Sequence, residues 1–222
     1  RKCIKTVNVG FIKDILPILL KGSVMTIELT VIALIFGTIL GIFLALLKLS
    51  KSMILRIISS IYTWVFRGTP LLLQLFFFYY GLPFVGIELK PFSAAVIGLS
   101  LNCGAYMAEI IRGGIQSIHK GQFEAAKALG FSYGETMRRI ILPQTWKVVI
   151  PPVGNEFIAI LKDTSLVSTI AMVELMRSAQ QIYASSFDPI SVFFTAAILY
   201  LIMTTVFTTV FSAFEKKLAI YS

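Results

Sequence analysis

The segment EAAKALGFSYGETMRRIILPQ, residues 124–144, is charged, whereas most of the chain is apolar. Its charged side chains are Glu124, Lys127, Glu135, Arg138 and Arg139. Apolar residues make up 57% of the 222 residues and charged residues only 14%, and long apolar segments flank this one on both sides. Several of these segments are long enough to cross a bilayer, which takes about 20 apolar residues. We therefore predict an all-α protein that crosses a membrane several times and leaves residues 124–144 outside the lipid.

Within the charged segment, the local signals predict two short helices joined by a glycine turn, over residues 121–142. Residues 122–129 are good helix formers, and Gly130 stands where helices commonly end. Ser132 and Glu135 have the spacing of a capping box, which would begin the second helix. Helices this short are unstable alone in water, so we expect them to pack on another surface, either this chain's own spans or a partner.

The second of these helices has an apolar face, and a proline follows it. The residues of that face recur at the helical period: Tyr133, Met137, Ile140 and Ile141. Pro143 comes directly after them, and we expect it to end or restart the helix.

Five apolar segments are candidate spans, over residues 22–47, 57–84, 91–111, 148–161 and 189–214. The fourth is too short to cross alone, unless its helix begins around Gln144 or other parts of the protein cover it. We expect the second span to be broken near Gly68, because Arg67-Gly68-Thr69-Pro70 interrupts it and proline is well placed to begin a new helix. Residues 8–21 predict a short amphipathic helix on the membrane surface, interrupted by Pro17. The predicted membrane domain covers residues 8–217, with tails at 1–7 and 218–222.

Lys and Arg residues gather beside the spans, mostly on one side, which explains the net charge of +9. By the positive-inside rule we place the N-terminus outside and the C-terminus in the cytoplasm, with the charged segment on the cytoplasmic side. No basic stripe with exposed aromatic residues is present, so we do not expect nucleic-acid binding. The single histidine and the two distant cysteines argue against a metal site.

The charged segment also resembles a family signature. Glu124-Ala125-Ala126, Gly130 and Leu142-Pro143 match, without gaps, the EAA motif of permease subunits of bacterial binding-protein-dependent ABC importers. Arg67-Gly68-Thr69-Pro70, residues 106–115 and residues 154–166 resemble the polar amino-acid branch of that family. The resemblance covers residues 15–217, which is nearly the whole chain.

This resemblance implies a type I ABC-importer permease fold with five transmembrane helices and a cytoplasmic pair of coupling helices. It implies a multi-pass protein of the bacterial plasma membrane, and a transport subunit rather than an enzyme. Its partners would be two ABC ATPase subunits, a second permease of the same or a homologous chain, and an external substrate-binding protein. No phosphate-binding loop is present in the sequence, so ATP and Mg²⁺ would be bound by the partner subunits, and this chain would carry no cofactor.

Polar residues inside spans are candidates for a substrate path, because they are costly in lipid. The candidates are Thr69, Gln74, Asn102, Tyr106, Asn155, Glu156, Asp163 and Thr164. A helix beginning at Pro70 would direct free N–H groups toward a substrate carboxylate, and Glu156 would face an ammonium group. Each candidate also has a structural alternative: Asn102 and Gln74 as bonds between helices, Glu156 as a partner of Lys162.

Two other functions stay open from the residues alone. A secondary transporter or channel would need no ATPase, but it predicts inverted repeats or more spans than we find. A structural or sensory membrane subunit with a docking hairpin is the third alternative.

Glu109 lies three residues before Arg112, which favours an ion pair at the cytoplasmic end of the third span over a substrate contact.

Overall fold

The computed structural model describes the backbone of residues 9–219 and the side chains of residues 10–217, and every regular element in this part is helical. The five long helices are α1 (Val9–Leu49), α2 (Met53–Gly68), α4 (Pro91–Ser117), α7 (Leu142–Asp163) and α9 (Pro189–Ala219). The short ones are α3 (Leu71–Phe76), η1 (Phe77–Gly81), η2 (Leu82–Val85), α5 (Lys120–Ala128), α6 (Tyr133–Thr136), η3 (Met137–Ile141), η4 (Thr164–Ile170) and α8 (Leu175–Ser186). The predicted tail 1–7 and the last residues of the other tail, 220–222, lie outside the described part.

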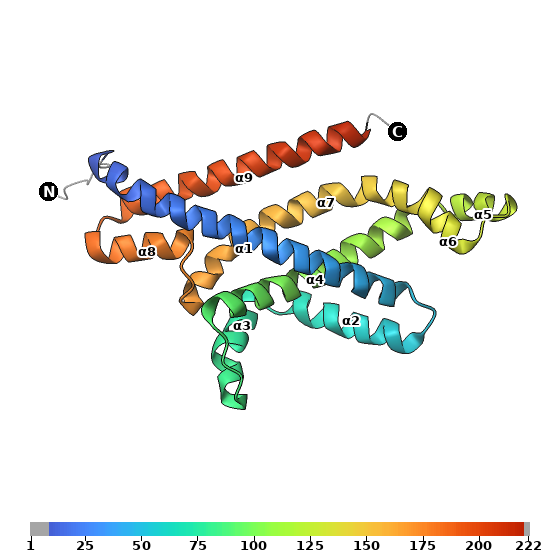
Figure 1. The fold of residues 1–222 in the computed structure, drawn as a ribbon, viewed down its shortest axis with the longest axis horizontal. Coiled ribbons are helices and arrows are strands. Elements are labelled where there is room, and N and C mark those ends of the chain that lie inside the picture. Colours follow the sequence, from blue (N-terminus) through green and yellow to red (C-terminus); the bar gives the residue numbers. More distant parts are fainter. Residues whose placement is uncertain (1–8, 220–222) are drawn as a thin grey trace.

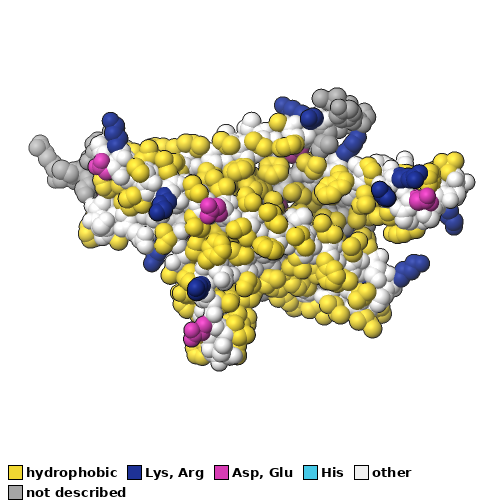
Figure 2. Space-filling view, viewed as in Figure 1, with side chains coloured by type: hydrophobic (Ala, Val, Ile, Leu, Met, Phe, Trp, Pro, Cys, Tyr) yellow, Lys and Arg dark blue, Asp and Glu magenta, His cyan; other side chains and the backbone are white. Residues whose placement is uncertain are grey.

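The long helices run along one direction of the molecule, with short helices at both ends (Figure 1). The pair α5 and α6 extends beyond one end, and α8 covers α1 and α9 at the other. The segment from α3 to η2 leaves this direction and projects as an arm. Hydrophobic side chains cover most of the visible face, and most Lys and Arg side chains gather toward its two ends (Figure 2). This distribution is what a protein surrounded by lipid requires.

Three helices, α1, α4 and α9, are long and apolar enough to cross a membrane, and the described residues contain a fourth span if α2 and Leu71–Val85 count as one. These two pieces meet at an angle of 102°, which confirms the predicted break near Gly68. The fourth expected span lies in α7, which does not pass the same test of length and apolarity. The structure thus identifies three or four of the five predicted spans.

The predicted interruption at Pro17 is wrong, because Pro17 lies inside α1, which continues for 41 residues. The residues around it, Ile15 and Leu19, are buried in the core with α8 and α9. This packing stabilises the helix where Pro17 removes one backbone hydrogen bond. The predicted surface helix is therefore the first part of α1.

The prediction for Pro143 is also only half right, because it begins a helix without ending the one before it. Helix α6, the π-helical turn η3 and α7 follow one another without a loop. A π-helical turn widens the backbone spiral and shifts its hydrogen bonds, which accommodates a residue without an N–H. The second predicted short helix is therefore continuous with α7.

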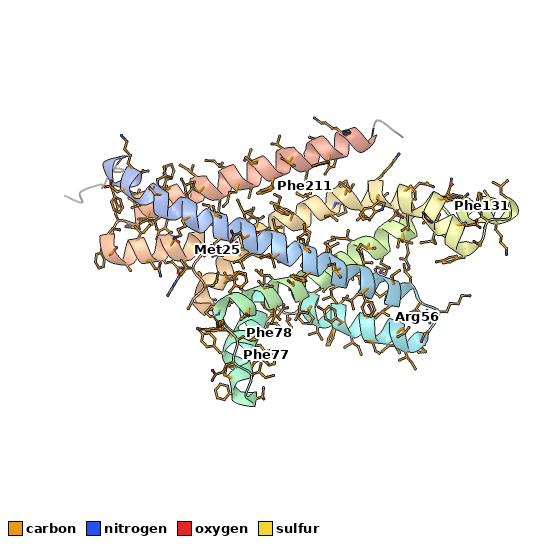
Figure 3. All side chains as sticks on the ribbon, in the orientation of Figure 1. Met25, Arg56, Phe77, Phe78, Phe131 and Phe211 are labelled. Atoms are coloured by element: carbon orange, nitrogen blue, oxygen red, sulfur yellow. The ribbon has the colours of Figure 1, made fainter. Side chains whose placement is uncertain are left out.

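Close packing between α1 and α4 forms the centre of the fold. A side chain at Gly37 would place its Cβ 2.5 Å from the sulfur of Cys103, and one at Gly41 would collide with Met107. The two glycines therefore let the helices approach closely, as small residues do in membrane proteins. Helices α7 and α9 pack together through aromatic rings. The ring centroids of Phe157 in α7 and Phe211 in α9 are 5.4 Å apart (Figure 3).

Candidate functional sites

A polar cavity of about 580 Å³ opens at the break between α2 and α3. Its lining comes from the break itself, from α4, from α7 and from η4: Arg67, Gly68, Thr69, Pro70, Leu71, Asn102, Tyr106, Glu156, Ala159, Asp163 and Leu166. Asn102 lies 11 residues into α4, or about 17 Å from its start, and α4 is about 40 Å long. The cavity is therefore near the middle of a spanning helix, where polar side chains are costly and mark functional sites.

Amide side chains hold the two halves of the broken segment together. The Gln74 amide nitrogen donates to the Phe66 carbonyl at 2.9 Å and to the Thr69 hydroxyl at 2.8 Å. Asn102 donates to the same carbonyl at 3.0 Å and to the Gln74 amide oxygen at 3.0 Å. These bonds satisfy backbone groups that the break leaves without helical partners. Gln74 is only 8% exposed, and it stabilises the break from behind the cavity wall.

A cluster of charges lies beside the cavity, around the single carboxylate of Glu109. One of its oxygens accepts from Lys48, and the other accepts from two nitrogens of Arg112, at 2.9 and 2.7 Å. This confirms the expected pair of Glu109 with Arg112. Lys48 also donates to Thr63, at 2.6 Å, so the cluster joins α1, α2 and α4.

Two carboxylates, Glu156 and Asp163, face the cavity from α7. Within the described side chains, neither has a salt bridge within 4.0 Å or a side-chain hydrogen bond. The alternative pairing of Glu156 with Lys162 is therefore not observed. Buried or half-buried carboxylates usually have a partner, so this pair has the chemistry to bind a cationic group.

The structure brings together five of the eight predicted substrate-path residues: Thr69, Asn102, Tyr106, Glu156 and Asp163. The other three lie elsewhere. Gln74 is behind the wall, Asn155 is exposed on another part of α7, and Thr164 is buried with its hydroxyl on the Leu161 carbonyl. The prediction missed Arg67, which lines the cavity. Arg67 is the one charged residue between positions 57 and 84, and that signal could have identified it.

The second region is the helix pair α5–α6, whose turn has the predicted local structure. Gly130 adopts a left-handed conformation, with φ of 83°. The N–H groups of Gly130 and Phe131 donate to the Lys127 and Ala126 carbonyls, the pattern of a Schellman motif. The expected glycine stop after α5 is confirmed.

The predicted capping box at the start of α6 is also present. The Glu135 N–H donates to the Ser132 hydroxyl at 3.3 Å, and the Ser132 N–H donates to the Glu135 carboxylate at 2.9 Å. The backbone N–H and hydroxyl of Ser132 hold the pKa of Glu135 below its usual range. Both ends of the turn are therefore fixed by backbone and side-chain hydrogen bonds.

Apolar side chains of this helix pair are exposed at the surface of the molecule. Leu129 is 77% exposed and Tyr133 is 73% exposed, although both flank the ordered turn. Of the predicted coupling residues, Glu124, Ala125, Gly130, Leu142 and Pro143 are exposed, and Ala126 is buried. Such a surface of apolar residues beside charged ones is typical of a docking site for another protein.

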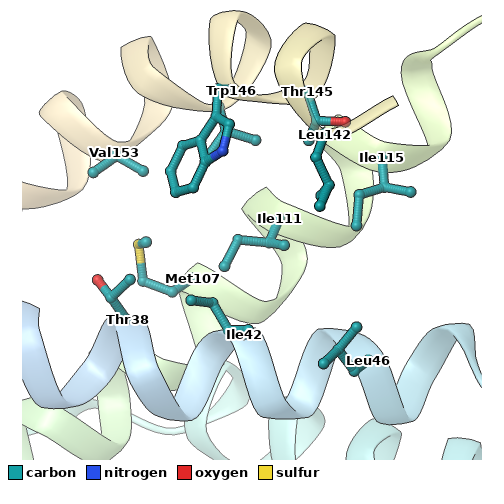
Figure 4. Close-up of a pocket in the computed structure, with 11 residues that line it drawn as sticks. Thr38, Ile42, Leu46, Met107, Ile111, Ile115, Leu142, Thr145, Trp146 and Val153 are labelled. Carbon is teal, nitrogen blue, oxygen red and sulfur yellow. The ribbon is translucent and has the colours of Figure 1, made fainter. Parts of the chain in front are cut away.

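A further groove between α1, α4 and α7 is almost entirely apolar (Figure 4). Trp146 and Leu142 of α7 face Ile42 and Met107 across it. It offers almost no polar group that would orient a charged molecule, and it is distinct from the cavity at the break. Among the described residues, no three His, Cys, Asp or Glu side chains lie close enough together to hold a metal ion.

A helical membrane protein with a polar cavity at a broken helix and an ordered, exposed helix pair belongs to the class of transport permeases. Comparison with known families makes this specific. Residues 37–220 match the family described as "Binding-protein-dependent transport system inner membrane component", and the chain belongs to this family.

Its relatives cover nearly its whole length. The L-cystine transport system permease protein TcyB of Bacillus subtilis (strain 168) is 46% identical over 206 residues, 92% of this chain and 88% of that protein. The arginine transport system permease protein ArtQ of the same organism is 42% identical over 204 residues, 91% and 93% of the two chains. The solved structure "Crystal structure of an amino acid ABC transporter with histidines" matches with a TM-score of 0.92 and 38% identity, over 96% of this chain and 100% of that one. The type I ABC-importer permease fold expected from the sequence is thereby confirmed.

Proposed function

We propose that this chain is the permease subunit of an ATP-driven, binding-protein-dependent importer of amino acids. The observation that carries the proposal is the cavity at the α2–α3 break, where Arg67 lies on one side and Glu156 and Asp163 come from α7. A free amino acid carries both a carboxylate and an ammonium group, and the cavity offers charges that complement both. The printed names of the relatives, for cystine and arginine transport systems, support the same class of substrate.

The helix pair α5–α6 is proposed to couple this cavity to ATP hydrolysis in partner subunits. Its exposed Leu129 and Tyr133, with Glu124 close by in the sequence, would enter a groove on an ABC ATPase. ATP and Mg²⁺ would bind the ATPases. Two ATPases, two permeases and an external binding protein complete the proposed assembly, with five spans per permease, the N-terminus outside and the C-terminus in the cytoplasm. Purification of the assembled complex would show whether the second permease is another copy of this chain or a different chain.

The experiment is reconstitution of the chain with its ATPase and binding protein in lipid vesicles. We expect ATP-dependent uptake of one or a few amino acids from a panel that includes arginine, glutamine, histidine and cystine. Asn102→Ala should lower uptake, because it removes a bond that closes the break at the cavity. Glu124→Lys should uncouple ATP hydrolysis from transport or release the ATPase. Uptake that continues without any ATPase would contradict the proposal.

A further inference from the structure

We propose that Arg67 is the residue that binds the carboxylate of the transported amino acid. The inference rests on the proposed function and adds a binding residue to it. Arg67 stands near the end of α2, 14 residues or about 21 Å from the start of that helix. Its side chain is 44% exposed and lines the cavity, so a molecule in the cavity can reach it.

The guanidinium of Arg67 is held in place by an aromatic ring and by a distant carboxylate. Its central carbon lies 5.3 Å from the centroid of the Tyr106 ring, within the range of a cation–π contact. Tyr106 also lines the cavity. This contact with the face of the ring uses none of the guanidinium N–H groups as hydrogen-bond donors, so they stay available to a ligand.

Glu109 does not satisfy Arg67. Both oxygens of Glu109 already accept hydrogen bonds from Lys48 and Arg112, whereas the nearest Arg67 nitrogen is 4.0 Å away. That distance is longer than a hydrogen bond. In the part of the chain that the structure describes, no group accepts a hydrogen bond from the Arg67 side chain.

The charges around Glu109 therefore do not balance. Three cations, Lys48, Arg67 and Arg112, share one carboxylate within 4.0 Å, which leaves two positive charges in excess. Arg112 lies near the C-terminal end of α4 and holds a Glu109 oxygen through two hydrogen bonds, whereas Arg67 lies at the cavity without a hydrogen-bond partner among the described residues. Glu156 and Asp163 line the same cavity, but neither lies within 4.0 Å of Arg67, so a carboxylate that enters the cavity can supply the close anion that stabilises a cation at this depth.

The two α7 carboxylates determine the orientation of the amino acid in the cavity. Glu156 and Asp163 repel a carboxylate and attract an ammonium group, whereas Arg67 does the reverse. An amino acid in the cavity is thus oriented with its carboxylate on Arg67, which binds it through two parallel N–H groups. Glu109 acts as a positioning residue, because it keeps Lys48 and Arg112 occupied and away from the substrate.

The test compares an amino acid with its own carboxamide, which keeps the ammonium group and side chain but lacks the negative charge. Purified permease–ATPase complex in lipid nanodiscs, without the binding protein, would be titrated with radiolabelled L-arginine, L-glutamine or L-cystine. The unlabelled carboxamide is the competitor. For the wild type we expect the amino acid to bind roughly 10- to 150-fold more tightly than its carboxamide, the range for a hydrogen-bonded charge pair.

In Arg67→Gln this preference should disappear, through weaker binding of the amino acid and unchanged binding of the carboxamide. Arg67→Lys keeps the charge without the planar fork and should retain part of the preference. Arg56→Gln is the matched control: it removes the same charge from the same helix, at an exposed site outside the cavity and the Glu109 cluster, and should keep the preference. Copurification of the ATPase with each variant checks that the fold is intact.

Three outcomes would overturn the inference. If Arg67→Gln keeps the wild-type preference, Arg67 does not bind the carboxylate, although amino-acid import still stands. If the wild-type complex binds no amino acid and the reconstituted importer takes up none, the proposed function and this inference fall together. An equal loss of preference in Arg67→Gln and Arg56→Gln would assign the effect to the overall positive charge of the permease and also reject the specific role of Arg67.

Discussion

The helix pair α5–α6 and the cavity at the α2–α3 break are both polar regions in an apolar protein, but they are built in opposite ways. The turn of the helix pair depends on residues close in sequence: Gly130 bonds to Lys127, and Ser132 bonds to Glu135. The cavity combines side chains from the α2–α3 break, from α4, from α7 and from η4, up to 99 residues apart (Arg67 to Leu166, 166 − 67).

Under the proposed function, this difference separates the binding of the partner at the helix pair from the binding of the substrate in the cavity. The helix pair forms its shape locally, so it can be ordered before a partner arrives, and most of its surface stays exposed. The cavity exists only when four elements are in place, so any movement between α4 and α7 changes it. Variants in the two regions should therefore fail in different assays.

The largest effect should come from Glu156→Gln. This change removes a negative charge from the cavity, while the ammonium group of the amino acid keeps its positive charge. Uptake of the amino acid should fall roughly 30-fold or more, because truncating one partner of a buried charge pair costs about 2–5 kcal/mol. Vesicle uptake with radiolabelled substrate measures this. The ATPase should still copurify. Glu88→Gln, the same change at an exposed site outside both regions, should leave uptake normal.

The next effect should come from Gly130→Val, which acts on the other region. A valine at φ of 83° is strained by about 1–2 kcal/mol, so the turn should refold and weaken ATPase binding roughly 5- to 30-fold. Binding of the ATPase to the immobilised permease measures this. Gly134→Ala, at an open position in α6, should bind normally. Equal weakening in both variants would show that any added side chain obstructs docking, and that the conformation of Gly130 is not the cause.

A smaller effect should follow from Tyr133→Ala. This change removes an exposed aromatic side chain without altering the capping box, and we expect roughly 5-fold weaker ATPase binding from the lost contact area. The same binding assay applies. Tyr183→Ala, at the far end of the molecule in α8, serves as the matched control. If amino-acid binding to the cavity weakened as much as ATPase binding, the separation between the two regions would be lost.

The smallest effect should be the pH dependence of the α6 cap. Because the folded state holds the pKa of Glu135 below its usual value, about 4.3, the cap is fully formed above pH 4.3. Its contribution is lost as the pH falls through the lower, folded-state pKa. Hydrogen exchange of the α6 amides should speed up over that range, and Glu135→Gln should remove most of the dependence. Exchange that changes equally in both proteins would assign the dependence to other groups.

The same contrast between local and long-range contacts explains which parts of the structure could be predicted from the sequence. The glycine stop, the capping box and the break near Gly68 were predicted correctly, because each depends on backbone geometry within a few residues. The interruption at Pro17 was wrong because the packing of Ile15 and Leu19 on distant helices overrides a local signal.

The sequence predicted which residues line the cavity better than it predicted which side chains those residues contact. Thr69, Asn102 and Glu156 were candidates because of their depth, and the cavity includes them. Hydropathy alone could not distinguish Gln74, whose amide is occupied by the break, from a side chain that faces open space. Arg67 was missed because its availability depends on Glu109 being occupied by Lys48 and Arg112, which come from two other helices.

The unbroken run of α6, η3 and α7 has a mechanical consequence. From Tyr133 to Asp163 it is about 46 Å long, and Pro143, Pro151 and Pro152 do not interrupt it. One end carries the exposed helix pair and the other carries the two cavity carboxylates. Over α7 alone, 22 residues or about 33 Å, a tilt of about 5° at one end moves the other by about 3 Å. That displacement is about the length of a hydrogen bond, so a slight rotation imposed at the helix-pair end is enough to break and remake the contacts of a bound ligand.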